Sequence, residues 1–307
     1  MDSAITHYTR KPRAGCNFSI EGIFEDVRQR LSRDLSIRQR IAPCHSNGLL
    51  RRIWIALDAW WHQGAITHVT GDINFAVIFL NGKRTILTSH DCSFLGRTRG
   101  LKYYVLRLFW VVLPTRRATF ITTVSQAAKN ELLSYASGCA ESKVIVIPNA
   151  ISTAFSFSYK AFPESPRLLQ VGTAVNKNLE RSIDALRGLD CTLAVIGKLP
   201  AELEQKCSEY KIHLETFQNL SQHEVVEQYR QCDIVLFPST IEGFGMPILE
   251  GQATGRPVVT SNVSSMPEVA GEAACLVDPF DVDSIRAGIM RVIQDGEYRQ
   301  QLVEKGL

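Results

Sequence analysis

The chain has 307 residues, of which 45% are hydrophobic and 21% are charged. This length indicates two domains and excludes a single small disulfide-stapled module, and the apolar content excludes a disordered chain. The net charge of +3 is unevenly spread, because residues 1–150 contain 20 Lys and Arg against 10 Asp and Glu (+10) and residues 151–307 contain 14 against 21 (−7). We therefore expect the two halves to face different partners.

Strand and helix patterns alternate along the first half. Short apolar runs predict strands at residues 5–9, 37–42, 66–70, 84–89, 119–125 and 143–148, and helical spacing predicts helices at residues 19–32 and 48–62. Residues 151–166 have no clear period and carry two prolines, which indicates a linker.

The alternation is clearer in the second half. Strands are predicted at residues 168–172, 192–197, 213–217, 233–239 and 257–261, and helices at residues 179–189, 201–209, 222–231 and from Pro247. Strands that alternate with helices in this way imply a parallel sheet covered on both faces. The predicted fold class is α/β, with two doubly wound Rossmann-like domains (residues 1–150 and 167–307) facing each other across a cleft at the carboxyl ends of their strands.

The cysteines and the N-terminus favour a cytoplasmic location. The 8 cysteines are scattered without a C-x-x-C pair, which is typical of reduced core thiols. The first residues, MDSAITHYTRKPR, lack the basic-then-apolar order of a secretory signal. The longest apolar run, residues 103–114, contains Arg107 and is shorter than the roughly 20 apolar residues of a membrane-spanning helix.

The most informative segment is FPSTIEGFGMPILEGQATGRPVV, residues 237–259. A strand leads into a loop with Gly243 and Gly245, and Pro247 suits the first position of a helix because its missing N–H is not needed there. The loop would bring the N–H groups of Phe244, Gly245 and Met246 to a helix N-terminus, which predicts a phosphate-binding loop.

Two carboxylates, Glu242 and Glu250, flank this loop with the spacing E-x7-E. A carboxylate beyond the phosphate end suits a sugar or ribose diol, because it accepts two hydrogen bonds. In the alternative interpretation, Glu242 only complements the helix dipole and Glu250 is a solvated surface residue.

The segment resembles the E-x7-E signature of retaining nucleotide-sugar glycosyltransferases of family 4, which have the GT-B fold. Further segments resemble the same family in the same order along the chain: residues 68–91, 121–133, 144–151, 168–186 and 264–279. The resemblance covers residues 5–307. It implies a sugar donor bound as a nucleotide diphosphate and no metal ion or other cofactor.

The resemblance implies roles for individual residues. Glu242 corresponds to the residue that meets the donor sugar, Glu250 to the one that binds the ribose hydroxyls, and Lys177 to the cation that neutralises the diphosphate. Many members have Arg directly after the glycine that corresponds to Gly172, whereas this chain has Thr173. One diphosphate cation is therefore missing or replaced, with Arg181 as a candidate. The alternative for Lys177 is a solvated loop lysine.

Two residues of the first half also match the family. His90 follows a predicted strand, and the resemblance places it beside the reacting sugar of the donor. The alternative is a structural histidine, with Asp91 either orienting His90 or capping the next helix. Gly15 resembles the family's glycine near the phosphates and the acceptor, although the segment RAGCNF lacks the usual glycine pair.

Other motifs are interpreted as structural. Asp281 and Asp283 spell D-x-D, the metal signature of the other major glycosyltransferase fold, but they directly precede a helical pattern and are expected to cap it. G-F-G-M-P-I-L-E-G is not the nicotinamide-binding G-x-G-x-x-G, and no Cys or His set has metal-ligand spacing.

The resemblance implies a retaining, metal-independent transfer of a sugar to a hydroxyl acceptor, in cell-surface polysaccharide or glycolipid assembly. One alternative is another GT-B enzyme, such as a sugar-nucleotide epimerase or a phosphorylase. The other is a non-catalytic GT-B binding or partner subunit, favoured by Thr173 and by a chain end at RQQLVEKGL, where relatives continue into a crossover helix.

The basic first half indicates an anionic partner, and we expect a glycan or lipid-linked glycan acceptor rather than a nucleic acid. Five cations bracket the apolar run 103–114, namely Arg97, Arg99, Lys102, Arg116 and Arg117. This pattern fits a segment lying on an anionic membrane, at the inner face of the plasma membrane. The alternative is a buried core helix with solvated flanks.

Overall fold

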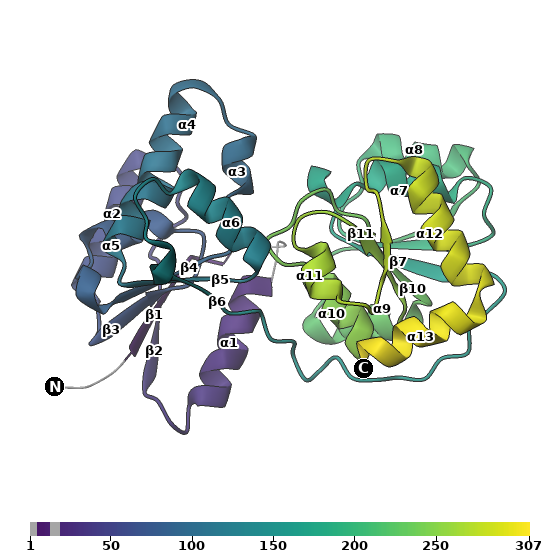
Figure 1. The fold of residues 1–307 in the computed structure, drawn as a ribbon, viewed down its shortest axis with the longest axis horizontal. Coiled ribbons are helices and arrows are strands. Elements are labelled where there is room, and N and C mark those ends of the chain that lie inside the picture. Colours follow the sequence, from purple (N-terminus) through teal and green to yellow (C-terminus); the bar gives the residue numbers. More distant parts are fainter. Residues whose placement is uncertain (1–4, 13–18) are drawn as a thin grey trace. The chain divides into compact units, whose positions relative to one another are not determined.

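The computed structural model describes residues 5–12 and 19–307. It divides the chain into two compact units, Met1–Ala150 and Ile151–Leu307 (Figure 1). Each unit is built around its own six-stranded parallel sheet with helices packed on it. The prediction of an α/β protein with two Rossmann-like sheets is confirmed.

The first sheet has the strand order β2-β1-β3-β4-β5-β6. Its strands are β1 (Ile5–Thr9), β2 (Ile37–Ile41), β3 (Ile66–Val69), β4 (Thr85–Ser89), β5 (Phe120–Thr123) and β6 (Val144–Val146). These bounds confirm the predicted strands, with small differences at the ends. The strand order reverses between β1 and β3, so the carboxyl ends of these two strands flank a topological switch point, where sheets of this type bind ligands.

The helices of the first unit bury one apolar side each against this sheet. They are α1 (Ser19–Leu31), α2 (Leu49–Trp61), α3 (Ser93–Gly96) and α6 (Gln126–Tyr135), with short 3-10 turns η1 (Asn74–Phe79), η2 (Gly82–Arg84) and η4 (Glu141–Lys143). The helices predicted at residues 19–32 and 48–62 are thus confirmed, and α3 and α6 were not predicted. Tyr8, Ile55, Leu87 and Ile121 are fully buried at the centre of the core.

The apolar run at residues 103–114 lies in one continuous helical segment. This segment consists of α4 (Gly100–Leu106), the π-helical η3 (Arg107–Val112) and α5 (Leu113–Arg117). Val111 and Val112 are buried in the core, whereas Tyr104 and Phe109 are exposed. The run is therefore a core helix at its C-terminal end and presents an apolar side to solvent at its N-terminal end.

The second sheet has the order β12-β11-β10-β7-β8-β9, which reverses between β7 and β10. Its strands are β7 (Arg167–Val171), β8 (Thr192–Ile196), β9 (His213–Phe217), β10 (Ile234–Phe237), β11 (Val258–Ser261) and β12 (Cys275–Val277). Its helices are η5 (Val175–Lys177), α7 (Leu179–Leu186), α8 (Ala201–Glu209), α9 (Gln222–Gln231), α10 (Met246–Ala253), α11 (Met266–Ala270), α12 (Val282–Gln294) and α13 (Gly296–Gly306). The carboxyl ends of β7 and β10 flank the switch point of this unit.

Seven of the cysteines lie in the described ranges, and all seven are free thiols. Five of them are buried, as expected for core residues. Among the helices that the structure describes, none is both long and apolar enough to cross a bilayer.

Candidate functional site

The segments that follow β7 and β10 meet at the switch point of the second unit. The N–H of Thr240, after β10, donates to the carbonyl of Asn176, after β7, at 2.8 Å. The side-chain amide of Asn178 donates to the carbonyls of Pro238 (3.0 Å) and Pro279 (2.6 Å). These bonds hold the two loops together, so the residues singled out in the separate sequence segments become neighbours.

Lys177 and Glu242 form the centre of this site. The ammonium nitrogen of Lys177 lies 2.6 Å from Oε1 of Glu242, and the same oxygen accepts a hydrogen bond of 3.1 Å from the side chain of Asn176. The Lys177 ammonium also lies 4.8 Å from the centre of the Phe237 ring. The side chains of Lys177 and Glu242 are only 20% and 15% exposed, which excludes the solvated loop lysine considered for Lys177.

The loop after Glu242 leads into the N-terminus of α10. Gly245 is the residue before the helix, with φ of 111°, a conformation that favours glycine. The helix begins at Met246, so the prediction that Pro247 is the first helical residue is wrong by one position. Within the described ranges, no acceptor contacts the backbone N–H groups of Phe244 and Met246. These groups and the helix dipole make the position suitable for an anion.

Serines from the segment before α11 fix the shape of this loop. The hydroxyl of Ser265 lies 2.9 Å from the carbonyl of Glu242 and 2.7 Å from that of Phe244. Ser264 adds a hydrogen bond of 2.8 Å to the carbonyl of Glu242. Both serines stand in the segment 264–279 that carried the family resemblance, but their role was not predicted.

Glu250 lies on α10 and is half-buried, so the alternative of a solvated surface residue is wrong. Its carboxylate accepts a hydrogen bond from the hydroxyl of Tyr229, a fully buried residue of α9. Burial raises the pKa of Glu250 to about 7, and the hydrogen bond from Tyr229 and the charge of Lys177 oppose this rise. Tyr229 was not predicted, because it lies on a different helix, 21 residues before its partner.

Gly172 and Thr173 begin the loop that carries Lys177. Gly172 has φ of 90°, and a Cβ there would come within 3.1 Å of Cε of Lys177, so glycine leaves room for the lysine chain. Thr173 is turned toward β8, because a Cβ on Gly197 would lie 2.7 Å from its methyl group. The guanidinium of Arg181, the candidate replacement cation, donates to the side chain of Asn178 at 3.0 Å.

In the first unit, His90 lies at the carboxyl end of β4. Its Nε2 donates to the carbonyl of Thr70 at 3.0 Å, and its ring makes an edge contact with Phe24. Burial lowers the pKa of His90, so the ring is neutral at neutral pH. Asp91 caps the turn at Ser93 by accepting from its N–H (3.0 Å) and hydroxyl (2.8 Å), so Thr70 rather than Asp91 orients His90. Gly15 lies outside the described residues.

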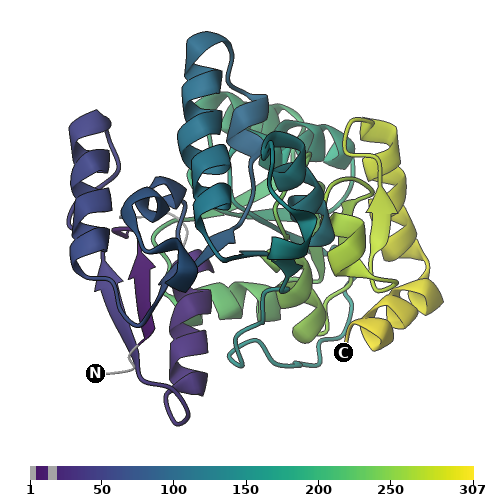
Figure 2. The same ribbon diagram turned by 60° about the vertical axis from the view of Figure 1, so that its left-hand side comes forward.

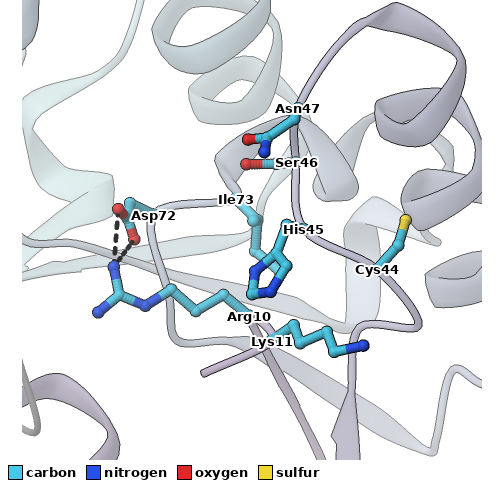
Figure 3. Close-up of a pocket in the computed structure, with 8 residues that line it drawn as sticks. All are labelled: Arg10, Lys11, Cys44, His45, Ser46, Asn47, Asp72 and Ile73. Atoms are coloured by element: carbon cyan, nitrogen blue, oxygen red, sulfur yellow. Dashed lines mark hydrogen bonds and ion pairs between the residues drawn. The ribbon is translucent and has the colours of Figure 1, made fainter. Parts of the chain in front are cut away.

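A polar pocket opens at the switch point of the first unit (Figure 3). Its volume is about 260 Å³, and it is lined by residues that follow β1, β2 and β3, namely Arg10, Lys11, Cys44, His45, Ser46, Asn47, Asp72 and Ile73. The guanidinium of Arg10 holds both carboxylate oxygens of Asp72 at 2.9 Å, and it also pairs with Glu21 of α1 at 2.7 Å. Asp72 remains about half exposed, at 48% of its side chain. The pocket was not predicted from the sequence.

The D-x-D segment caps a helix, as predicted. The carboxylate of Asp281 accepts a hydrogen bond of 3.0 Å from the N–H of Asp283 at the start of α12. In the described part of the chain, no group of three or more His, Cys, Asp and Glu is arranged to hold a metal ion.

Family models match both units. Residues 152–307, about half of the chain, match the model described as glycosyl transferases group 1. The chain belongs to this family. Residues 24–155 match the model described as Glycosyltransferase Family 4. The family resemblance inferred from the E-x7-E segment is therefore confirmed at the level of the glycosyl transferases group 1 family.

Individual relatives and structures give the same result. The chain is 47% identical over 79 residues (26% of this chain and 21% of the relative) to the O-antigen chain mannosyltransferase B of Escherichia coli. It is 24% identical over 295 residues (78% of this chain) to the serotype-specific mannosyltransferase WbdA of Escherichia coli. It spans only about a third of the length of WbdA.

The crystal structure of HepE from Anabaena, in complex with UDP and glucose, has the same fold. It superposes with a TM-score of 0.77 at 15% identity, covering 99% of this chain and 93% of HepE. The group 1 chain described here therefore has the GT-B fold.

Proposed function

We propose that this group 1 chain is a retaining glycosyltransferase that moves a sugar from a nucleotide diphosphate donor to a hydroxyl group of a glycan or lipid-linked glycan. The observation that carries the proposal is the pair of Lys177 and Glu242, 2.6 Å apart, beside the N-terminus of α10 at the switch point of the second unit. The names of the relatives support it, because one is an O-antigen chain mannosyltransferase and another is a serotype-specific mannosyltransferase.

The diphosphate would be met by Lys177 and by the backbone N–H groups of Phe244 and Met246. Lysine has three donor hydrogens, so pairing with Glu242 leaves two for phosphate oxygens. As the bond from the sugar to the diphosphate breaks, negative charge grows on the leaving group and positive charge on the sugar. Donors fixed in advance stabilise this charge without reorganising, which needs neither a metal ion nor a general acid.

A second cation would take over the role of the arginine that many family members have at the position of Thr173. Lys198 is exposed and follows β8 directly after Gly197, the glycine against which Thr173 packs. We propose Lys198 beside Arg181 as a candidate for this role. Its position was not recognised in the sequence, because it follows a neighbouring strand, 25 residues beyond Thr173.

Glu250 and Tyr229 would bind the ribose. A carboxylate accepts hydrogen bonds from both hydroxyls of a diol, and the hydroxyl of Tyr229 holds the Glu250 side chain in one orientation. Glu242 would meet the donor sugar, and its carboxylate is oriented for this by Lys177 and Asn176. The acceptor would attack from the side of the leaving group, which retains the configuration of the sugar.

The acceptor would bind to the first unit, at His90 and at the pocket that Asp72 lines. The pocket presents a carboxylate, an amide, a hydroxyl and an imidazole at the carboxyl ends of its strands, a set that suits the hydroxyl groups of a sugar. We place the enzyme in the cytoplasm, at an anionic membrane surface on the inner face of the plasma membrane, in cell-surface polysaccharide or glycolipid assembly.

Donor binding tests this proposal. UDP-, GDP- and ADP-sugars are each added to the protein, and thermal unfolding is followed by circular dichroism. A donor present at 100 times its dissociation constant stabilises the fold by about 2.7 kcal/mol, and we expect this shift for one base and its loss in Lys177→Ala. No shift with any of the three bases contradicts the proposal. Binding without turnover would instead identify a partner subunit.

A further inference from the structure

Helix α2 presents an apolar stripe to solvent. Seven large side chains on it are between 41% and 82% exposed: Leu49, Leu50, Ile53, Trp54, Leu57, Trp60 and Trp61. Figure 2 shows α2 at the margin of the first unit. The opposite side of the helix is the one that packs into the core, through Ile55, Ala56 and Ala59. Single exposed apolar residues are common on protein surfaces, but seven on one helix mark an interaction surface.

A second apolar stripe lies on α4 and η3. Its exposed residues follow the pattern i, i+3, i+4, i+7, i+8, which places them on one side of a helix: Leu101, Tyr104, Val105, Leu108 and Phe109. The two helical segments meet where the guanidinium of Arg52, on α2, lies 4.6 Å from the centre of the Trp110 ring, on η3. The two stripes therefore lie on helical segments of the same unit that approach each other at this contact.

The charges around both stripes have one sign. The sequence has no Asp or Glu from residue 35 to 57 or from residue 92 to 130, and these stretches hold 4 and 7 Lys and Arg. The one acidic residue of α2, Asp58, is buried and paired with Arg40 at 2.5 Å. Within these two stretches, exposed cations therefore border the stripes and no exposed carboxylate occurs, which favours an anionic partner.

We infer that the stripes of α2 and α4 lie on the interface of a membrane that contains anionic lipids. Trp and Tyr are the residues that favour the boundary between lipid headgroups and acyl chains, and α2 alone presents three Trp. A helix with apolar residues on one side and flanking Arg and Lys is attracted by both the acyl boundary and the negative headgroups.

The arginines at the end of the helical segment have other partners. From the sequence, Arg116 and Arg117 were expected to flank a run bound to the bilayer. Their guanidinium groups instead donate to the backbone carbonyls of Ser137 (3.0 Å) and Leu80 (2.8 Å), respectively. We therefore assign the membrane contact to α2 and to the N-terminal part of the run at residues 103–114, and not to the whole run. It rests on the proposed membrane association but not on the proposed transfer reaction.

Intrinsic fluorescence reports directly on this surface. The chain has 4 Trp, at positions 54, 60, 61 and 110, all on α2 and η3. Vesicles of phosphatidylcholine with or without phosphatidylglycerol are added to the whole protein. We expect the emission to shift to shorter wavelength only with the anionic vesicles, to be quenched by brominated lipid, and to return as salt is raised.

Co-sedimentation with the same vesicles compares matched variants. Leu50→Gln with Trp54→Gln changes the α2 stripe, and Tyr159→Gln with Leu276→Gln makes an equivalent change at exposed positions of the second unit. We expect the α2 variant to bind anionic vesicles about tenfold or more weakly and the control to bind like the wild type. These side chains are exposed, and an unchanged circular dichroism melt shows that each variant folds.

Other results overturn the inference. They are no binding to anionic vesicles at low salt, equal binding to neutral ones, or equal binding by the α2 variant. A wild-type dimer that the α2 variant converts to a monomer in sedimentation, without vesicle binding, would assign the surface to a second copy of the chain. Hydrolysis of a soluble donor, measured in parallel, tests the transfer reaction separately, since it should be the same in both double variants.

Discussion

The raised pKa of Glu250 makes the stability of the second unit depend on pH. Burial raises this pKa from 4.5 to about 7, so between these values the folded protein holds a proton that the unfolded chain releases. The free energy of unfolding of the wild type should therefore fall as pH rises from about 4.5 to about 7 and stay level above. Glu250→Gln does not titrate and still accepts the hydrogen bond from Tyr229, so it should lack this fall.

The magnitude follows from the interval between the two pKa values. At about 1.4 kcal/mol per pH unit, the fall in the free energy of unfolding reaches about 3 kcal/mol. Partial exposure of the carboxyl group reduces this fall to about 1 to 2 kcal/mol. Urea unfolding of the wild type and of Glu250→Gln at pH 5 and pH 8 measures this fall, as the change with pH in the difference between their free energies of unfolding. The signal must be circular dichroism, because all 4 Trp lie in the first unit. A difference that is the same at both pH values would refute the reasoning.

Lys177→Ala and Glu242→Gln should each lower turnover by about 2.7 to 4 kcal/mol in activation free energy with the fold intact, and rates within twofold of wild type in a steady-state assay would contradict this. Transfer should persist in EDTA; complete loss that manganese or magnesium restores would show that the leaving group needs a metal. Gly172→Ala should destabilise the second unit by about 1 kcal/mol or more in urea, because its φ is positive and Cε of Lys177 lies 3.1 Å from the new Cβ, and an unchanged midpoint would count against this. Asp72→Asn should raise the KM for the acceptor while donor hydrolysis stays constant, and a change in hydrolysis alone would remove Asp72 from the acceptor site.

The strands and the donor loop could be predicted because their signals are local. Buried parallel strands are continuous apolar runs, and the loop at Gly243 and Gly245 stands between a strand and a helix with its special residues in order. The strand order of each sheet, and with it the position of the switch points, could not be read from these local signals. That order brings Lys177 to Glu242, 65 residues apart.

The surroundings of single residues depended on contacts distant in sequence. The surroundings of Glu250 depend on Tyr229 of another helix, and the orientation of His90 depends on Thr70, which follows another strand. The helical pattern at residues 48–62 was recognised, but an apolar residue on either side of such a helix looks the same in the sequence. Only the packing of α2 shows that Trp54 and Trp61 face solvent.

Donor turnover tests the central claim most directly. The wild type is incubated with each of the UDP-, GDP- and ADP-sugars in EDTA, and release of the nucleoside diphosphate is followed together with the anomeric proton of the released sugar by nuclear magnetic resonance. We expect one donor to be turned over with retained configuration, and Glu242→Gln to reduce the rate about a hundredfold or more. Binding of a donor without any release, or release at the same rate in Glu242→Gln, would contradict a glycosyltransferase site at Lys177 and Glu242.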